Sequence, residues 1–374
     1  MTIKKKLLFL LLLIAVLLSI KFYSSYKKII VFVMLLALIP FMKCVNIIVH
    51  KQVSDTLSWT KQNDGIENIK FIKTPNIYFI EPDGYAGKEV MEQSPYNYNN
   101  TMYKYLELND FTLYKNTVSN YPATLPSNAS MFCMKHHFME KIVSNNFEME
   151  DAREIIVGNN PVISIFKKNG YKTLFIVNDE YFQQSFKKGN YDYFNIKNSE
   201  IPYFVSGIEV SKNVSKDFEH AMQMKEFNNH PKFYFIERML PHHVEFQNKG
   251  KDVEKKLYLN KIEKANLFLK KTIDLINKKD PSAIIIIASD HGGWVGIESL
   301  QEMLQMKDKK MLNSIFGNLI AIKWNDKRHL EYDGKLKSNV NLFRILFSYL
   351  SENKQLLLNI EKDVSYNNGY GSFL

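Results

Sequence analysis

The first fifty residues contain two apolar runs that are separated by a short basic stretch. The runs are Leu7–Ile20 and Ile29–Met42, and each is slightly short for a bilayer span. Aromatic residues between them can extend a span into the membrane interface. The basic start at Lys4–Lys6 also fits a signal peptide, but no convincing small-residue cleavage site follows. We therefore expect residues 1–50 to form a membrane anchor with two hydrophobic segments.

The lysines around these segments give conflicting signals about orientation. Lys21, Lys27 and Lys28 favour a cytoplasmic turn between the spans, which would place the chain beyond Lys51 outside the cell. Lys4–Lys6 favour a cytoplasmic N-terminus equally strongly, although two spans place both ends of the anchor on one side. The sequence therefore leaves the orientation of the anchor open.

After the anchor, residues 51–75 are polar and patternless, which predicts a linker, and short apolar runs then alternate with helical stretches. The predicted strands are Asn76–Glu81, Thr173–Val177, Phe233–Glu237, Ala283–Ser289 and Leu319–Lys323. The predicted helices are Ser127–His137, Pro161–Asn169, Val253–Asn277 and Val340–Leu350. Nearly continuous apolar strands that alternate with helices predict an α/β domain over residues 76–374, with a mostly parallel sheet flanked by helices.

Polar residues follow four of these strands at the point where each strand ends. They are Asp83, then Asn178 and Asp179, then His242 and His243, then Asp290 and His291. Sites in open α/β sheets gather at the carboxyl ends of the strands. A single polar residue after a strand is more often just part of a polar loop. Four strand ends that all carry such residues predict a shared functional site.

Composition and charge narrow the function classes. The chain has 374 residues, of which 45% are hydrophobic and 24% charged, which argues against disorder and against a polytopic transporter. The formal net charge is +10, but the lysines are scattered and not gathered beside aromatic nucleic-acid motifs, so we expect no nucleic-acid partner. An anionic membrane surface or a phosphorylated substrate explains the positive sign of the net charge. Cys44 and Cys133 are too far apart in sequence for a disulfide framework or a cysteine zinc site.

The segment Ser289–Gly293 has the chemistry of a metal site. A carboxylate and an imidazole side by side at a strand end, Asp290 and His291, can both reach one divalent ion, and the glycines allow close backbone approach. Asp83 occupies the same place after the first strand and supplies a third ligand. Glu81 is the competing carboxylate in the same segment, and it ranks second to Asp83 because Pro82 displaces it from the turn.

A hydroxyl nucleophile is predicted in the segment Tyr121–Ser130. Thr124 lies just before a helix that Pro126 and Ser127 can start, and a helix N-terminus favours a phosphate or sulfate ester. A hydroxyl needs a base or a metal to become a good nucleophile at neutral pH. Ser127 also fits a plain helix cap, so the residues alone leave Thr124 and Ser127 as equal candidates.

These features together resemble the alkaline phosphatase/sulfatase superfamily, in which an Asp follows the first strand, a nucleophile stands two residues before a Pro, and a late S-D-H-G follows. The likeness is nearest to the membrane-anchored bacterial branch of lipoteichoic acid synthases and phosphoethanolamine transferases. The segments that carry it are Asn76–Ala86, Thr124–Ser127, Asn169–Thr173, Leu240–His242, Ile284–Gly292 and Asn339–Arg344. The resemblance selects Thr124 as nucleophile and makes Ser127 a bystander. Cysteine is absent from position 124, so the formylglycine chemistry of true sulfatases is not available.

The resemblance implies a set of site residues. One divalent ion (manganese, magnesium or zinc) would be held by Asp83, Thr124, Asp290 and His291, because no second Asp-x-x-x-His set for another metal is found in the sequence. His242 would be a proton donor or a phosphate contact, although a hydrogen-bonded loop histidine is an equal alternative. The expected substrate contacts are His243 and Asn128.

The function that the resemblance implies is a phosphotransferase at the cell membrane, with an extracytoplasmic catalytic domain over residues 76–374. It would move a phospho-alcohol group of the phosphoglycerol or phosphoethanolamine type from a membrane phospholipid donor. The acceptor would be a cell-surface polysaccharide or glycolipid, and the intermediate a phospho-threonine. The alternatives are a phosphodiesterase or sulfuric-ester hydrolase with the same site, and an inactive binding or scaffold protein.

Overall fold

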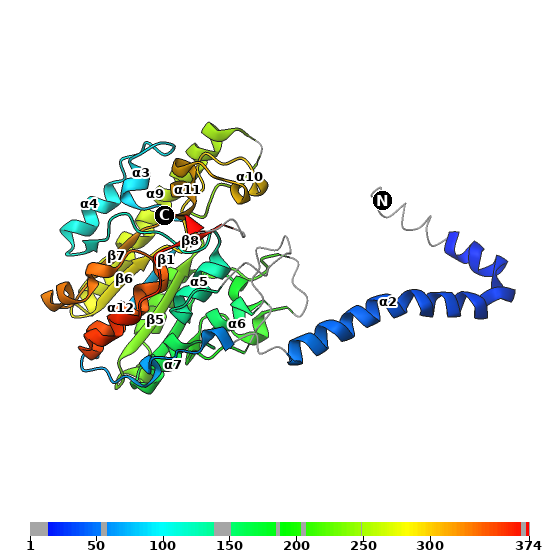
Figure 1. Ribbon diagram of the computed structural model, residues 1–374, viewed down its shortest axis with the longest axis horizontal. Coiled ribbons are helices and arrows are strands. Elements are labelled where there is room, and N and C mark those ends of the chain that lie inside the picture. Colours follow the sequence, from blue (N-terminus) through cyan, green and yellow to red (C-terminus); the bar gives the residue numbers. More distant parts are fainter. Residues whose placement is uncertain are drawn as a thin grey trace. The chain divides into compact units, whose positions relative to one another are not determined.

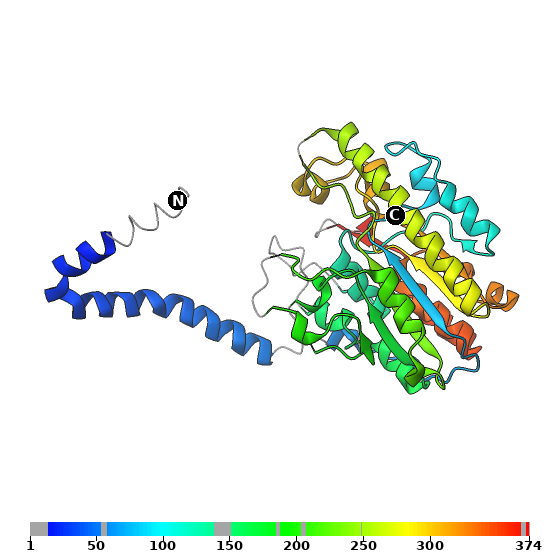
Figure 2. The same ribbon diagram turned by 180° about the vertical axis from the view of Figure 1, so that it is seen from behind.

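The computed structural model describes residues 14–53, 58–137, 151–184, 188–202, 207–247, 249–367 and 372–373. Contacts within the chain divide it into two compact units, Met1–Ser58 and Trp59–Leu374. Figures 1 and 2 show the two units from opposite sides.

The N-terminal unit contains the helix α2 (Tyr26–Val53), whose described side chains are exposed. The stretch Tyr23–Val45 is 23 residues long and apolar enough to cross a membrane. A signal sequence near the N-terminus meets the same criteria of length and apolarity, so the anchor stays a prediction. Residues 7–13 of the other predicted segment lie outside the described residues.

The larger unit is built on a seven-stranded sheet with the strand order β2-β7-β6-β1-β5-β3-β4. Strands β6, β1, β5, β3 and β4 run parallel, whereas β7 is antiparallel to both β6 and β2. The strands are β1 (Ile77–Pro82), β2 (Thr112–Leu113), β3 (Lys172–Ile176), β4 (Tyr193–Phe194), β5 (Lys232–Arg238), β6 (Ile284–Ala288), β7 (Ile320–Lys323), and a separate pair β8 (Ser365–Tyr366) and β9 (Ser372–Phe373). The predicted α/β fold with a mostly parallel sheet is confirmed.

Helices cover both faces of this sheet. They are α3 (Lys88–Met91), α4 (Thr101–Leu108), α5 (Thr124–Cys133), α6 (Ala152–Ile156), α7 (Pro161–Lys168), α8 (Val214–Met222), α9 (Lys251–Lys279), α10 (Leu300–Leu304), α11 (Lys309–Phe316) and α12 (Leu342–Ser351). Side chains alternate along β1, because successive residues of a strand point to opposite faces. Phe79 stacks on Phe343 of α12, which lies on the near face in Figure 1. Tyr78 packs edge-on against Phe218 of α8, in the core that also contains α9, on the face seen in Figure 2.

The start of α5 differs from the sequence prediction. The helix was expected to begin at Ser127, but it begins at Thr124, because Ala123 has the extended conformation of an N-cap and Pro126 falls in the first turn. Ser127 therefore lies inside the helix and is not its cap. Thr124 is the first helical residue, with its side chain at the end where the backbone N–H groups are unpaired.

Part of the segment predicted as a linker, residues 51–75, packs against the larger unit. Phe71 lies against Phe166 and Phe347, and the carboxylate of Asp64 forms an ion pair with Arg344, which is almost fully buried. The contact boundary therefore falls at Ser58 and Trp59. Aromatic packing and one buried ion pair hold this segment to α7 and α12.

Candidate functional site

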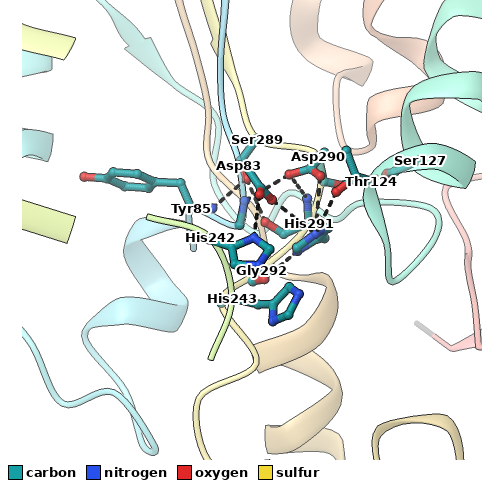
Figure 3. Close-up of polar contacts among 12 residues, drawn as sticks. Asp83, Tyr85, Thr124, Ser127, His242, His243, Ser289, Asp290, His291 and Gly292 are labelled. Atoms are coloured by element: carbon teal, nitrogen blue, oxygen red, sulfur yellow. Dashed lines mark hydrogen bonds and ion pairs between the residues drawn. The ribbon is translucent and has the colours of Figure 1, made fainter. Parts of the chain in front are cut away.

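The predicted metal ligands meet at the carboxyl ends of β1 and β6, which are neighbouring parallel strands. Asp83 follows β1, Asp290 and His291 follow β6, and one ligand atom from each lies within 4.8 Å of the others. All three side chains are buried. Figure 3 shows Asp83, Asp290 and His291 pointing toward one another beside Thr124. Segments more than 200 residues apart in sequence thus form one polar centre.

Each carboxylate uses one oxygen to hold the loops and leaves the other without a partner. Oδ1 of Asp290 accepts the N–H groups of Gly84 and His291, each at 3.0 Å. Oδ2 of Asp83 contacts Nδ1 of His242 at 2.7 Å. The remaining oxygens, Oδ1 of Asp83 and Oδ2 of Asp290, are buried and make no hydrogen bond. Both lie near Nε2 of His291, at 3.4 and 3.3 Å.

The imidazole of His291 is oriented for metal binding. Its Nδ1 lies 2.7 Å from the carbonyl oxygen of Gly292, which fixes the proton on Nδ1 because a carbonyl can only accept. Nε2 then carries the free lone pair and faces the two unpartnered carboxylate oxygens. Two carboxylate oxygens and one imidazole nitrogen, all buried, are a donor set that fits a divalent cation.

Thr124 lies beside this donor set, and Ser127 does not. Oγ1 of Thr124 is 3.4 Å from Nε2 of His291, and the side chain is partly exposed. The Ser127 hydroxyl is buried and donates to the backbone carbonyl of Asp290 at 2.6 Å. Ser127 therefore joins α5 to the loop after β6, while the Thr124 hydroxyl stays accessible to a substrate.

Both the backbone and the side chain of His242 contact Asp83. Its backbone N–H donates to the Asp83 carbonyl at 2.8 Å, in addition to the side-chain contact at Nδ1. Burial lowers the pKa of His242, but the charge and hydrogen bond of Asp83 outweigh it, so the pKa is raised. Gly84 allows this approach, since its φ is +66° and a Cβ there would lie 2.8 Å from the His242 carbonyl carbon.

His243 and Asn128, the predicted substrate contacts, lie in different surroundings. The His243 ring stacks on Trp294 at 3.8 Å, and Nδ1 lies 2.5 Å from the Val244 carbonyl. Burial and the neighbouring histidines lower the pKa of His243 well below its usual value. Asn128 is buried in α5 and its amide donates to Glu81 at 2.7 Å. Oε1 of Glu81, the competing carboxylate, is thus used by Asn128, while its Oε2 is buried without a hydrogen bond.

A phenol from α9 connects the two loops that carry the donor set. The hydroxyl of Tyr258 donates to the Gly84 carbonyl at 2.9 Å. The ring of Tyr258 covers Gly293, where a Cβ would lie 2.3 Å from the ring. Gly293 N–H in turn donates to the hydroxyl of Tyr96 at 3.0 Å. The positions of Asp83 and Asp290 therefore depend on a rigid helix, although α9 carries no donor.

The site opens into a cavity of about 400 Å³. Its polar wall includes Asp83, His242, His243 and His291, which follow strand ends, and Thr124 at the start of α5. The sequence prediction missed the rest of the lining, which is mainly apolar: Ala123, Tyr181, Phe182, Glu237, Met239, Phe246, Trp294 and Leu300. Two of these residues could have been found from their position in the sequence, because Glu237 ends a predicted strand and Trp294 directly follows the D-H-G-G motif. Asn178 and Asp179 follow β3, but they do not line this cavity.

A family comparison agrees with this geometry: the family model described as Sulfatase matches residues 86–314, more than half of the chain. The chain belongs to the Sulfatase family. It is therefore a sulfatase-like enzyme of the alkaline phosphatase superfamily, and the resemblance seen in the sequence is confirmed at this level. No curated protein matches the chain at a significant level.

Solved structures share the fold of this sulfatase-family chain at low identity. Lipooligosaccharide phosphoethanolamine transferase A (EptA) of Neisseria meningitidis, an integral membrane protein, is 13% identical, with TM-score 0.53 over 94% of this chain and 70% of that one. A Bacteroides thetaiotaomicron protein of glycosaminoglycan metabolism is 12% identical, with TM-score 0.50 over 76% and 74%. The periplasmic domain of Escherichia coli EcEptC, solved with Zn, is 13% identical, with TM-score 0.48 over 76% and 85%. At these identities, the first two structures show a common fold and no more.

Removing the Asp290 charge tests the donor set. Asp290→Asn keeps an oxygen for the Gly84 and His291 N–H groups but removes a negative ligand, so we expect Mn²⁺ and Zn²⁺ binding to be lost in calorimetry. At a metal concentration 100 times Kd, the parent chain should gain about 2.7 kcal/mol of unfolding free energy and the variant none. Asp179→Asn, at another strand end, is the matched control. Parent-like metal affinity in Asp290→Asn would contradict the assignment.

Removing the Tyr258 hydroxyl tests the support of the loops. Tyr258→Phe leaves the ring over Gly293 but deletes the hydrogen bond to Gly84, so we expect metal affinity to fall by about tenfold. Tyr105→Phe, which deletes a phenol contact to Asp274 on the outer side of α9, is the control. Calorimetric Kd values and the melting temperatures of the metal-free variants separate the two effects. Equal Kd values for both variants would show that the Tyr258 hydroxyl does not position the ligands.

Proposed function

We propose that this enzyme is a metal-dependent transferase that moves a phospho-alcohol group, of the phosphoglycerol or phosphoethanolamine type, through a phospho-threonine intermediate. The donor is a membrane phospholipid, and the acceptor is a polysaccharide or glycolipid of the cell surface. The observation that supports it most is the accessible Thr124 hydroxyl, 3.4 Å from the free nitrogen of His291, at the first residue of α5. The catalytic domain acts outside the cytoplasm, anchored by residues 1–50.

In this proposal Asp83, Asp290, His291 and Thr124 hold one divalent ion. The bound ion, manganese, magnesium or zinc, would lower the pKa of the Thr124 hydroxyl and offset the charge on the phosphoryl oxygens. The N-terminal N–H groups of α5 add a favourable field for an anionic group at Thr124. His243 lines the cavity and remains a predicted substrate contact, whereas Asn128 is buried, donates to Glu81 and does not line the cavity.

The transfer takes two balanced steps. First, Oγ1 of Thr124 forms a bond to phosphorus, its proton passes to solvent, and the bond from phosphorus to the lipid oxygen breaks. His242, held by Asp83, donates a proton to that departing oxygen. Then an acceptor hydroxyl forms a bond to phosphorus and gives its proton to His242, while the bond between Thr124 and phosphorus breaks and Oγ1 of Thr124 takes up a proton from solvent. The enzyme returns to its starting state.

A hydrolase is the second candidate, because the matching family model is that of sulfatases. It would use the same residues, with water in place of the acceptor hydroxyl. Position 124 is threonine and not cysteine, which favours phosphodiesters over the sulfate esters cleaved by formylglycine enzymes. Rapid turnover of an aryl phosphodiester or aryl sulfate without any alcohol acceptor would favour the hydrolase.

Replacing Thr124 tests both candidates. The purified chain in detergent is incubated with Mn²⁺ and with phosphatidylethanolamine or phosphatidylglycerol, and its mass is then measured. We expect a phospho-alcohol adduct on Thr124. Thr124→Ala should reduce product formation by at least about a thousandfold. Thr124→Ser, which keeps the hydroxyl, is the matched control and should retain measurable activity. An adduct on another residue, or full activity of Thr124→Ala, would remove Thr124 from the mechanism.

A further inference from the structure

A second cavity, of about 580 Å³, lies at the end of the sheet opposite the candidate metal site. Its walls come from the amino ends of β1 and β5 and from α8 and α9, which cover the face of the sheet seen in Figure 2. Tyr78 lines this cavity, and Asp83 follows the other end of the same strand, about 16 Å away at the rise of an extended strand. The cavity has the size of a small-molecule site and shares no lining residue with the candidate active site.

Lys232 places an unpaired positive charge on the inner wall of this cavity. It is the first residue of β5 and is only 9% exposed. Its backbone N–H donates to Oδ1 of Asn76 at 2.8 Å, but its ammonium group makes no hydrogen bond or ion pair with any residue that the structure describes. Lysine is rarely buried without a partner, because burial removes the ammonium group from water. A ligand with an acid group would supply the missing partner.

Asp280 places a negative charge on the same wall. It is the C-cap of α9, and its Oδ2 accepts hydrogen bonds from the Asn76 amide at 2.7 Å and from the Tyr78 hydroxyl at 3.0 Å. Its other oxygen, Oδ1, makes no hydrogen bond to a described residue. Asn76 contacts both Asp280 and Lys232, so the two residues are neighbours, yet the described part of the chain contains no ion pair between them. Two opposite charges therefore lie close together without neutralising each other.

The rest of the lining is neutral overall. Glu219 of α8 and Lys279 of α9 add one charge of each sign, and both side chains are exposed to solvent. Met222 and Leu275, from the same two helices, add apolar surface. A ligand in this cavity therefore meets one inner charge of each sign and an apolar part of the wall.

Separated charges on a wall favour a ligand that carries the reverse arrangement. A simple acid would pair with Lys232 and face the negative charge of Asp280, and a simple amine would face the opposite conflict. A metal ion does not fit this wall, because the ammonium group of Lys232 only donates hydrogen bonds and cannot be a ligand. A molecule with one acid group and one ammonium group satisfies both residues at once.

We infer that this cavity binds a small zwitterion of the α-amino acid class. Its carboxylate contacts the ammonium group of Lys232, and its ammonium group contacts Oδ1 of Asp280. Because these two residues are neighbours, the two charges of the ligand must also be close, as they are in an α-amino acid. An apolar side chain of the ligand packs against Met222 and Leu275. The inference goes beyond the proposed transfer, since no residue of the candidate active site lines this cavity.

The test compares three molecules of similar shape that differ in charge. The full chain in detergent is titrated at neutral pH with L-leucine, with 4-methylpentanoate, which lacks the ammonium group, and with 3-methylbutylamine, which lacks the carboxylate. We expect L-leucine to bind about tenfold more tightly than either analogue in calorimetry, because each analogue loses one charge-assisted contact.

Two variants remove the two contacts separately. Lys232→Met keeps most of the side-chain volume and should weaken L-leucine binding about tenfold, without weakening 3-methylbutylamine binding. Asp280→Asn should weaken L-leucine binding to a similar extent, without weakening 4-methylpentanoate binding. Lys264→Met, which removes an exposed charge from α9, is the matched control and should keep the parent affinity. Thr124→Ala should also bind L-leucine as tightly as the parent chain, because the two cavities are separate.

A parent chain that binds L-leucine no more tightly than the two analogues would overturn the inference, and this measurement needs no variant. A preference for L-leucine that survives in both Lys232→Met and Asp280→Asn would overturn it as well. Loss of L-leucine binding in Thr124→Ala would place the ligand in the candidate active site and contradict a separate site. None of these measurements involves transfer, so their failure leaves the proposed function untouched.

Discussion

Two buried carboxylate oxygens without partners, aimed at the same imidazole nitrogen, are the feature on which the rest of the site depends. Oδ1 of Asp83 and Oδ2 of Asp290 both lie within 3.4 Å of Nε2 of His291. The ligand atoms of the two carboxylates lie within 4.8 Å of one another, and buried like charges at that distance repel, while each ion also loses several kcal/mol of solvation. A bound cation would compensate this arrangement, so the three side chains form a candidate site for a divalent metal ion.

The surrounding structure keeps these oxygens in place against their repulsion. Parallel pairing of β1 and β6 brings the two loops to one edge of the sheet, and Oδ1 of Asp290 ties them together through Gly84. Tyr258 and Ser127 attach the loops to α9 and α5. As α5 starts at Thr124, the contact of Ser127 that fixes the Asp290 loop also sets the position of the Thr124 side chain. The candidate metal ligands and the proposed nucleophile are therefore held by one connected set of contacts.

The sequence predicted the longer strands of the sheet and the three residues of the donor set, because both follow from local rules. Apolar runs predicted β1, β3, β5, β6 and β7 within a residue or two, and polar strand ends predicted Asp83, Asp290 and His291. The two-residue strands β2 and β4 were missed, since their pairing comes from tertiary contacts and not from a pattern. Tyr258 and the cavity wall were also missed. Nothing in a regular helix distinguishes a tyrosine that supports a distant loop, and a cavity is formed by segments that only the fold brings together.

The direct test of this view is a crystal structure of the chain grown with Mn²⁺, with the anomalous signal used to locate the ion. We predict one ion bonded to Oδ1 of Asp83, Oδ2 of Asp290 and Nε2 of His291, with Oγ1 of Thr124 as a further ligand. An ion bound elsewhere, or unpaired carboxylates that remain empty at saturating Mn²⁺, would contradict the metal-centred enzyme.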